Sequence, residues 1–303
     1  MKRSFICCST LALALCAGAE VKPPPAVSAL EGQRVAFIGD SITQGGMYTV
    51  LTEYVLRKTY PQLSFECFSL GLSSETLSGL SEPEHLKHGF ARPCVFERLG
   101  RLLEKVKPDI VFACYGMNDA IYMPLDDARF AAFKDGVNNF VKQCQASGVK
   151  RIYLLTPPIY DDPESVYKDV LKAYADWEMG LALPGVQPID VQSVMRAARD
   201  KQAAPFSPDK VHPDSNGHWV MAQAILQGLG VPLPKESLAE IQADGLFKLV
   251  QAKRNVRSNG WMPHIGYTRE KTVAPQPLGD TEEKAAAIQK QIEAFLGARN
   301  ATP

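Results

Sequence analysis

The feature that most constrains the fold of this chain is an alternation of short apolar runs with longer amphipathic stretches. We expect strands over 34–39, 64–70, 110–115, 151–156 and 186–191. We expect helices over 47–60, 95–106, 127–147, 166–183 and 215–229. The apolar runs are apolar on both faces, which is typical of parallel strands covered by helices on both sides. The alternation therefore predicts an α/β fold with right-handed crossovers and an open, doubly wound sheet.

Three candidate site residues stand directly after predicted strands: Ser41, Gly71 and Asn118. Ligands of open parallel sheets bind outside the carboxyl ends of the strands, near the point where the strand order reverses. We therefore expect these three residues on one edge of the sheet.

Ser41 has the position of a nucleophile, because it lies between a buried strand and a turn that contains glycines. Such a turn lifts Oγ out of the sheet, and backbone N–H groups near a helix start can face a developing anion. Taken alone, this serine is better explained as the cap of the next helix. We interpret the preceding Asp40 as a residue that stabilises the turn.

A base and a carboxylate follow near the end of the alternating region. Asp209 and His212 are three residues apart in a loop bounded by prolines. A serine hydroxyl is a poor nucleophile until a base takes its proton, and histidine does this best when a carboxylate fixes its tautomer. We predict that His212 Nε2 faces Ser41 Oγ and that Nδ1–H faces Asp209. With these partners, the nucleophile becomes the favoured interpretation of Ser41.

Acyl transfer also needs donors for the negative charge that builds on the carbonyl oxygen. Gly71 can present a backbone N–H without a side chain in the way, and Asn118 offers its amide. The N–H of Ser41 is the third predicted donor. As alternatives, Gly71 is needed only because glycine allows its backbone conformation, and Asn118 only forms a hydrogen bond within its own loop. We favour the oxyanion hole, with Asp119 supporting the Asn118 loop.

Together these motifs resemble those of the GDSL-type SGNH hydrolases, a family of serine esterases, lipases and deacetylases. The four positions that name the family correspond to Ser41, Gly71, Asn118 and His212, and Asp209 lies in the last motif. The resemblance covers roughly 34–229. It implies a flavodoxin-like three-layer α/β/α sandwich, ester hydrolysis through an acyl-serine intermediate, and no cofactor.

We divide the chain into a signal peptide over 1–19, a linker over 20–33, a hydrolase domain over 34–230 and a helical extension over 231–303. Lys2 and Arg3 precede an apolar run, and a small-x-small site ends at Ala19, which is typical of a secretory signal. We expect an exported protein, periplasmic or extracellular. The run is too short for a stable membrane span. Lipoprotein anchoring at Cys16 is the less favoured alternative, because Leu15 is bulky for such a site.

Charge and cysteine content exclude other classes. The chain holds 33 basic and 33 acidic residues without a basic block, so we do not expect a nucleic-acid partner. The cysteines beyond the signal are Cys67, Cys94, Cys114 and Cys144. Those in predicted strands are expected to be buried free thiols. No Cys-x-x-Cys pair occurs, and His85 and His88 are better explained by a solvated polar loop than by a metal site.

In the extension, helices are expected over 237–256 and 281–296, with a non-helical segment over 259–272. This segment holds Trp261, His264, Tyr267 and Arg269. Packing onto the main domain is the favoured interpretation. The sharper hypothesis is a rim beside the active site, in which Trp261 or Tyr267 stacks on a sugar ring.

The sequence thus predicts an exported serine esterase that acts on a small-molecule or carbohydrate ester, with deacetylation of a carbohydrate as the suggested reaction. Alternatives are a lipase- or thioesterase-type acylhydrolase, an acyltransferase in which an acceptor hydroxyl outcompetes water, and a non-catalytic carbohydrate-binding relative. The intact Ser41, Asp209 and His212 count against the last. No long apolar lid segment is apparent, which argues against an interfacial lipase.

Overall fold

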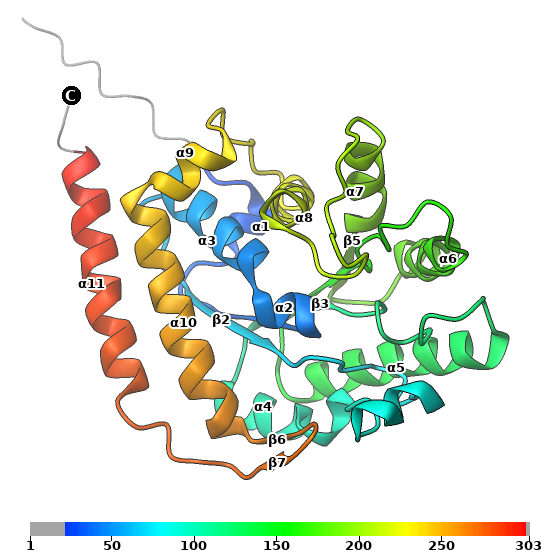
Figure 1. Cartoon of the computed structure of the whole chain (residues 1–303). Helices are drawn as coiled ribbons and strands as arrows, with labels where there is room; N and C mark the ends of the chain where they lie inside the picture. Colours follow the sequence, from blue (N-terminus) through cyan, green and yellow to red (C-terminus); the bar gives the residue numbers. More distant parts are fainter. Residues whose placement is uncertain (1–21, 301–303) are drawn as a thin grey trace, which may run out of the picture.

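A computed structural model describes residues 22–300, so the predicted signal peptide and Cys16 lie outside the described residues. A parallel five-stranded sheet in the order β2-β1-β3-β4-β5 forms the centre (Figure 1). Its strands are β1 (Arg34–Gly39), β2 (Glu66–Gly71), β3 (Ile110–Cys114), β4 (Arg151–Leu155) and β5 (Val186–Ile189). This arrangement confirms the predicted α/β fold.

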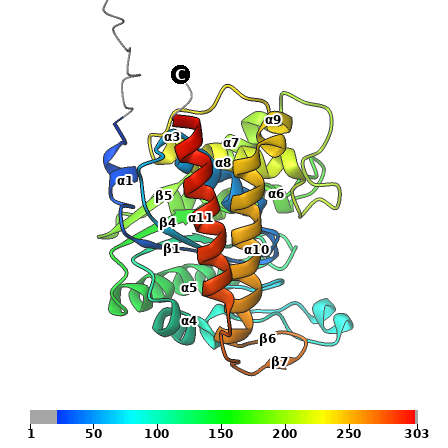
Figure 2. The ribbon, with the colours of Figure 1, turned by 90° about the vertical axis from the view of Figure 1, so that its left-hand side faces the viewer.

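Helices cover both faces of the sheet. They are α2 (Ser41–Gly45), α3 (Met47–Thr59), α4 (Leu99–Val106), α5 (Asp127–Ala146), α6 (Tyr167–Met179), α7 (Val191–Arg199) and α8 (Ser215–Gly228). Figures 1 and 2 show α3, α7 and α8 on one face and α4 and α5 on the other. Helix α6 packs beside α5, where the rings of Tyr174 and Phe133 stack at 4.5 Å. The α2 and α7 helices were not predicted.

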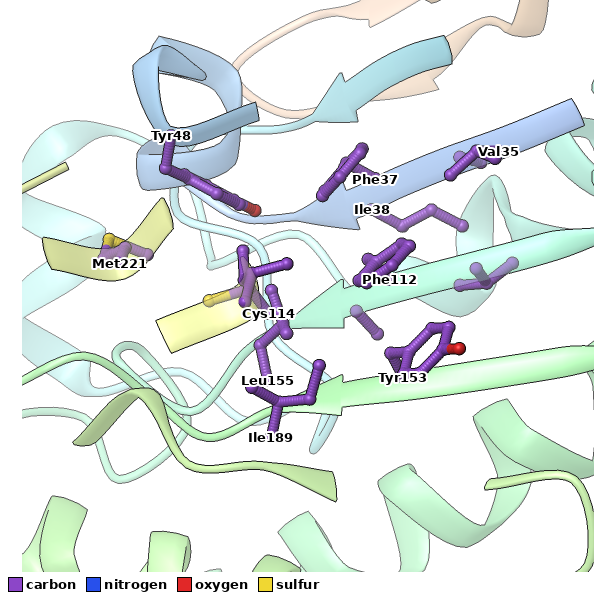
Figure 3. Packing of buried hydrophobic residues seen from close by; sticks show 14 of the residues in the cluster. Val35, Phe37, Ile38, Tyr48, Phe112, Cys114, Tyr153, Leu155, Ile189 and Met221 are labelled. Atoms are coloured by element: carbon purple, nitrogen blue, oxygen red, sulfur yellow. The ribbon is translucent and has the colours of Figure 1, made fainter. Parts of the chain in front are cut away.

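A row of aromatic rings crosses the centre of the sheet. Phe37, Phe112 and Tyr153 are register partners on β1, β3 and β4 (Figure 3). Their rings stack at 4.7 and 4.5 Å, and each side chain is at most 2% exposed. A slip of one residue would turn these rings to the other face, so their packing fixes the register of the central strands.

The strand order determines where a site can form. The chain passes from β1 to β2 on one side and then crosses back to β3 on the other side of β1. The strand order therefore reverses between β1 and β3, and the residues after these strands meet at their carboxyl ends. This is the usual ligand-binding position of such a sheet.

The C-terminal segment contains α9 (Leu238–Ala243), α10 (Gly245–Ile265), the hairpin of β6 (Tyr267–Thr268) and β7 (Thr272–Val273), and α11 (Thr281–Asn300). The predicted helix over 237–256 is thus two helices, and α10 continues into the segment predicted to be non-helical. The α10 helix lies along the edge strand β2, where Ser258 Oγ donates to Ser69 O at 2.7 Å. Covering an edge strand in this way blocks pairing with other chains.

A buried ionic cluster attaches α10 to α3. Lys253 Nζ and Arg57 Nε contact Glu53 Oε1 at 2.6 and 2.8 Å, and all three side chains are at most 3% exposed. Burial by itself would raise the pKa of Glu53, but the two cations lower it to about 2. Removing one partner from such a cluster leaves a buried charge without compensation.

The short helix α1 (Pro25–Ser28) lies in the predicted linker. Val27 and Leu30 are at most 1% exposed and belong to the core, so part of the linker packs onto the domain. Within residues 22–300, no helix is both long and apolar enough to cross a membrane. The cysteines at 67, 94, 114 and 144 are free, and Cys67 and Cys114 are buried, as predicted.

Candidate active site

Ser41, His212 and Asp209 form one hydrogen-bonded series at the carboxyl edge of the sheet. Ser41 Oγ lies 2.8 Å from His212 Nε2, and His212 Nδ1 lies 2.6 Å from Asp209 Oδ2. Asp209 Oδ1 accepts the backbone N–H of His212 at 2.7 Å. The structure therefore brings together the three residues that the sequence proposed as nucleophile, base and orienting carboxylate.

The base and its carboxylate are accessible to solvent. The side chains of His212 and Asp209 are 51% and 56% exposed. Burial would raise the pKa of the Asp209 carboxyl, but hydrogen bonds from the His212 ring and from two backbone N–H groups outweigh it and lower the pKa. Asp209 is therefore held as a carboxylate that can orient the Nδ1–H of His212.

Asp161 anchors the loop that carries Asp209 and His212. This buried carboxylate accepts the backbone N–H groups of Phe206 at 2.5 Å and Ser207 at 3.1 Å. Its other oxygen accepts Arg199 Nε at 2.7 Å. The loop is thus fixed to the segment after β4, although its tip is exposed.

Ser41 is the first residue of α2, and the preceding Asp40 is the N-cap. Asp40 Oδ1 accepts the backbone N–H of Ile42 at 2.9 Å, which agrees with the predicted role in the turn. Asp40 is 2% exposed. Burial is the main reason that its pKa rises to about 7, and the negative charges of Asp119 and Glu75 raise it further.

The amide of Asn118 has a fixed orientation. Its Oδ1 accepts Arg92 Nη1 at 2.8 Å and Tyr122 Oη at 3.1 Å, while its Nδ2 donates to the carbonyl of Glu75 at 3.2 Å. Arg92 is itself held by two contacts to the carboxylate of Glu82, at 2.6 and 2.7 Å. Two donors on Oδ1 prevent the amide from flipping, so Nδ2 stays on the side of Glu75 and Asp40. Sequence reasoning missed Arg92 and Tyr122.

Asp119 joins two loops, as its predicted supporting role requires. Its Oδ1 accepts the backbone N–H groups of Leu77 and Ser78, and its Oδ2 accepts that of Gly116. Burial raises the pKa of Asp119 to about 6 against these hydrogen bonds. The loops after β2 and β3 therefore form one unit.

The structure contradicts the oxyanion role predicted for Gly71. The N–H groups of Glu66 and Leu72 donate to Gln33 and Gly39 on the β1 side, each at 2.9 Å. Because amides alternate in direction along a strand, the N–H of Gly71 faces the other edge, toward α10. A Cβ at Gly71 would lie 2.2 Å from the backbone N of Gln44. Gly71 is thus needed for the close packing of α2 against β2.

The residues after β2 that line the cavity of Ser41 are Ser73 and Ser74, not Gly71. Ser74 lines the same cavity as Ser41, Asn118 and His212, with a φ of 66°. Such a φ is uncommon for residues other than glycine, and it is concentrated at functional sites. The N–H of Ser74 has no acceptor within the part of the chain that the structure describes. Its left-handed conformation was not visible in the sequence, because the residue is not a glycine.

This cavity has a volume of about 460 Å³. Besides the residues above, its wall includes His85, Phe90, Arg92 and Arg269. His85 is only 6% exposed, and its Nδ1 lies 2.8 Å from the carbonyl oxygen of Phe90. His85 itself is therefore packed into the wall of the cavity, while most of the loop around it, including His88, is exposed as predicted.

Trp261 packs onto the main domain, as the favoured interpretation predicted, and does not line the cavity of Ser41. Trp261 is 5% exposed, packs edge-to-face on Phe68 at 5.5 Å, and donates to Glu282 at 2.6 Å. Tyr267 lines an adjoining cavity of about 330 Å³, which shares Arg269 and Glu270 with the cavity of Ser41. The residues of the C-terminal segment that line the Ser41 cavity are instead Arg269 and Glu270.

The sequence matches the model of the GDSL-like Lipase/Acylhydrolase family over residues 37–220. No protein of curated function matches the sequence. A catalytic mutant of an acetylxylan esterase from Geobacillus stearothermophilus is similar in structure, with a TM-score of 0.51 and 21% identity over 68% of this chain and 98% of that chain.

A second mutant of that enzyme, described as an acetyl-xylooligosaccharide esterase, gives a TM-score of 0.52 and 22% identity over 68% and 98% of the two chains. A gut microbial diltiazem-metabolizing enzyme gives 0.53 and 20% over 70% of this chain and 48% of that chain. At these identities the likeness concerns the fold.

Proposed function

The chain belongs to the GDSL-like lipase/acylhydrolase family of ester-hydrolysing enzymes, and on that premise we propose that it is an exported esterase that deacetylates carbohydrates. The observation that carries its hydrolytic mechanism is the series Asp209–His212–Ser41, with contacts of 2.6 and 2.8 Å. Family membership favours an enzyme over the non-catalytic relative.

In the first step, Ser41 Oγ attacks the carbonyl carbon of the ester. His212 Nε2 accepts the hydroxyl proton as the bond forms, and the carboxylate of Asp209 stabilises the resulting imidazolium. The short contacts in the free protein place the base within reach before substrate binds.

Three donors would hold the oxyanion of the tetrahedral intermediate. They are the backbone N–H groups of Ser41 and Ser74 and the Nδ2 of Asn118. One hydrogen of Asn118 Nδ2 is directed at the Glu75 carbonyl. The other has only a long contact of 3.5 Å to Asp40, so it is available to donate to the oxyanion. Fixed donors of this kind stabilise the charge that develops in the transition state.

Collapse of the intermediate breaks the bond between the carbonyl carbon and the alcohol oxygen. His212 returns its proton to the departing alcohol, and an acyl-serine remains. Water then attacks the acyl group, with His212 again as base, and the carboxylic acid leaves Ser41. An acceptor hydroxyl in place of water would give the acyltransferase alternative.

The carbohydrate substrate is supported by the polar character of the cavity, in which Arg92 and Arg269 stand beside the rings of Tyr122 and Phe90. Aromatic faces with adjacent hydrogen-bonding groups suit sugar rings. The fold shared with an acetylxylan esterase makes an acetylated xylooligosaccharide the first substrate to test. Export is supported by the predicted signal over 1–19.

A lipase-type acylhydrolase is the second candidate. Leu86 and Leu125 are 59% and 50% exposed and lie near His85 and Tyr122 in the chain, which line the cavity. Exposed apolar side chains on the segments that line a cavity suit a longer acyl chain. Turnover of p-nitrophenyl esters from acetate to decanoate separates the two candidates, because a deacetylase loses activity as the chain lengthens.

The primary test is labelling by a fluorophosphonate probe, with p-nitrophenyl acetate turnover in parallel. We expect the wild type to be labelled and Ser41→Ala to lose both labelling and turnover. Ser28→Ala, on the remote helix α1, is the control and should keep both. Labelling of a folded Ser41→Ala variant would overturn the assignment of the nucleophile. Acetate release from acetylated xylotriose then tests the carbohydrate substrate.

A further inference from the structure

We propose that the turn of the C-terminal hairpin forms the subsite for the alcohol part of the ester, and that Arg269 and Glu270 select an uncharged, polyhydroxylated alcohol. This subsite rests on the carbohydrate esterase function proposed above. Residues 267–273 lie outside the range that matches the family, which ends at 220. The specificity would therefore come from a segment that the family motifs do not include.

The hairpin reaches the cavity from the end of α10. It joins the lower ends of α10 and α11 in Figure 2. Arg269 and Glu270, in the turn between β6 and β7, line the cavity that also contains Ser41 and His212. When the acetyl group of a sugar lies against Ser41, the sugar itself would therefore lie next to the turn.

Contacts with the main domain hold the hairpin in place. Arg101 Nε donates to the Ile265 carbonyl at 3.0 Å, and Lys105 Nζ donates to the His264 carbonyl at 2.6 Å. The N–H of Thr268 donates to the Glu97 carboxylate at 3.1 Å. Fixed contacts at the base of the hairpin reduce the entropy that substrate binding would have to overcome.

Arg269 has an ordered guanidinium with hydrogen-bonding capacity left over. Its Nε donates to the Ser73 carbonyl at 3.1 Å, Nη2 lies 3.4 Å from Ser74 Oγ, and the group lies 4.7 Å from the centre of the Phe90 ring. No carboxylate contacts Arg269 in the described residues. Arg92, the other guanidinium of the cavity, is by contrast occupied by Glu82 and Asn118.

Glu270 is exposed and has neither a hydrogen bond nor an ion pair within residues 22–300. Arg269 supplies donors and Glu270 supplies acceptors, and each hydroxyl of a sugar can both donate and accept. The negative charge of Glu270 would repel an anionic alcohol, and the positive charge of Arg269 would repel a cationic one. The pair therefore favours an uncharged alcohol with several hydroxyl groups over an aryl or alkyl alcohol.

The test compares kcat/KM for acetylated xylotriose with kcat/KM for p-nitrophenyl acetate. We expect the ratio of the two to fall by about tenfold in Glu270→Ala and in Arg269→Gln, because a charged hydrogen bond to the sugar is lost. Lys271→Ala is the matched control, since this exposed neighbour in the same turn does not line the Ser41 cavity. Its ratio should equal that of the wild type.

The outcomes separate this subsite from the function on which it rests. An unchanged ratio in Glu270→Ala, which removes no hydrogen bond or ion pair within residues 22–300, would overturn the subsite while the esterase function stands. A wild type that hydrolyses p-nitrophenyl acetate but no acetylated xylotriose would overturn the carbohydrate substrate, and the subsite with it. Free xylotriose should also inhibit p-nitrophenyl acetate turnover less in Glu270→Ala than in wild type, and equal inhibition counts against the subsite.

Discussion

The two sides of the candidate active site are built in opposite ways. On the side of the proposed oxyanion hole, Asp40, Asn118 and Asp119 are at most 3% exposed. On the side of the proposed base, His212 and Asp209 are about half exposed and depend on hydrogen bonds within their own loop. One side is part of the core, and the other is attached to its surface.

This difference matches two physical tasks. Donors that stabilise a developing charge act best when they are fixed and shielded from water before the reaction starts. A base needs a short contact to the nucleophile and room to exchange its proton with substrate and water. We therefore expect substitutions on the exposed side to affect activity alone, and substitutions on the buried side to affect stability as well.

The largest expected effect is on the exposed side. His212→Ala should reduce kcat for p-nitrophenyl acetate by about 10³-fold or more, because Ser41 loses its base. The melting temperature should stay within about 1 °C of wild type, since few contacts are lost from a half-exposed side chain. Turnover and thermal unfolding of the same preparation check both statements. A large fall in melting temperature would contradict the surface attachment of the loop.

On the buried side, Gly71→Ala should destabilise the protein by about 3 kcal/mol or more. Its Cβ would lie 2.2 Å from the backbone N of Gln44, which no side-chain rotation can relieve. Gly45→Ala is the matched control, because no atom lies within 4 Å of its added Cβ and alanine favours helix α2. Urea unfolding of both variants should separate them clearly. Equal midpoints would contradict the close packing of α2 on β2.

Asp40 should contribute to the pH dependence of the free energy of unfolding. Burial raises its pKa from 3.8 to about 7, so the folded state retains a proton that the unfolded state has lost. Stability from this group is complete below about pH 4 and declines as the pH rises to about 7. In Asp40→Asn, the free energy of unfolding should fall less between pH 4 and pH 7, by up to a few kcal/mol. Urea unfolding at pH 4, 5.5 and 7 tests this, and equal slopes for variant and wild type would refute it.

Arg92 tests how far the buried side depends on the orientation of one amide. Arg92→Gln removes the contact of 2.8 Å that holds Asn118 Oδ1, so the amide can rotate. We expect kcat for p-nitrophenyl acetate to fall by about 10- to 100-fold with little change in KM, because a transition-state contact is lost. Arg92→Lys should recover part of kcat. A change confined to KM would instead assign Arg92 to substrate binding.

The smallest effect is expected at Ser74. Ser74→Gly keeps the backbone N–H and relieves the φ of 66°, so activity should be retained and stability should change by about 1 kcal/mol or less. If Ser74→Gly loses most of its turnover while remaining folded, the side chain rather than the amide has the function.

The main fold and the Ser41–His212–Asp209 series could be predicted, because their signals are local. Short apolar runs bounded by polar turns gave the five strands to within two residues at each end. The spacing of Asp209 and His212 put both side chains on one turn. Family motifs then joined this turn to Ser41, which is 171 residues away from His212.

The errors arose where the direction of a group depends on its neighbours. Strand pairing sets the direction of the N–H of Gly71, which ends β2, whereas Ser74 lies three residues further on in the following loop. The segment predicted to be non-helical over 259–272 begins as helix, because α10 continues to Ile265. Gly260 instead permits Thr281 to approach, since a Cβ there would lie 2.0 Å from the Thr281 hydroxyl.

The sequence by itself determined the parallel sheet, the order of the motifs and the identity of the proposed nucleophile, base and carboxylate. Tertiary structure decided that Ser74 rather than Gly71 lines the cavity of Ser41, that Arg92 orients Asn118, and that Arg269 rather than Trp261 reaches the cavity. The physical reason is the distance along the chain over which each interaction acts. Periodicity and turn chemistry act over a few residues along the chain, whereas the direction of an amide or a guanidinium depends on distant segments that fold against it.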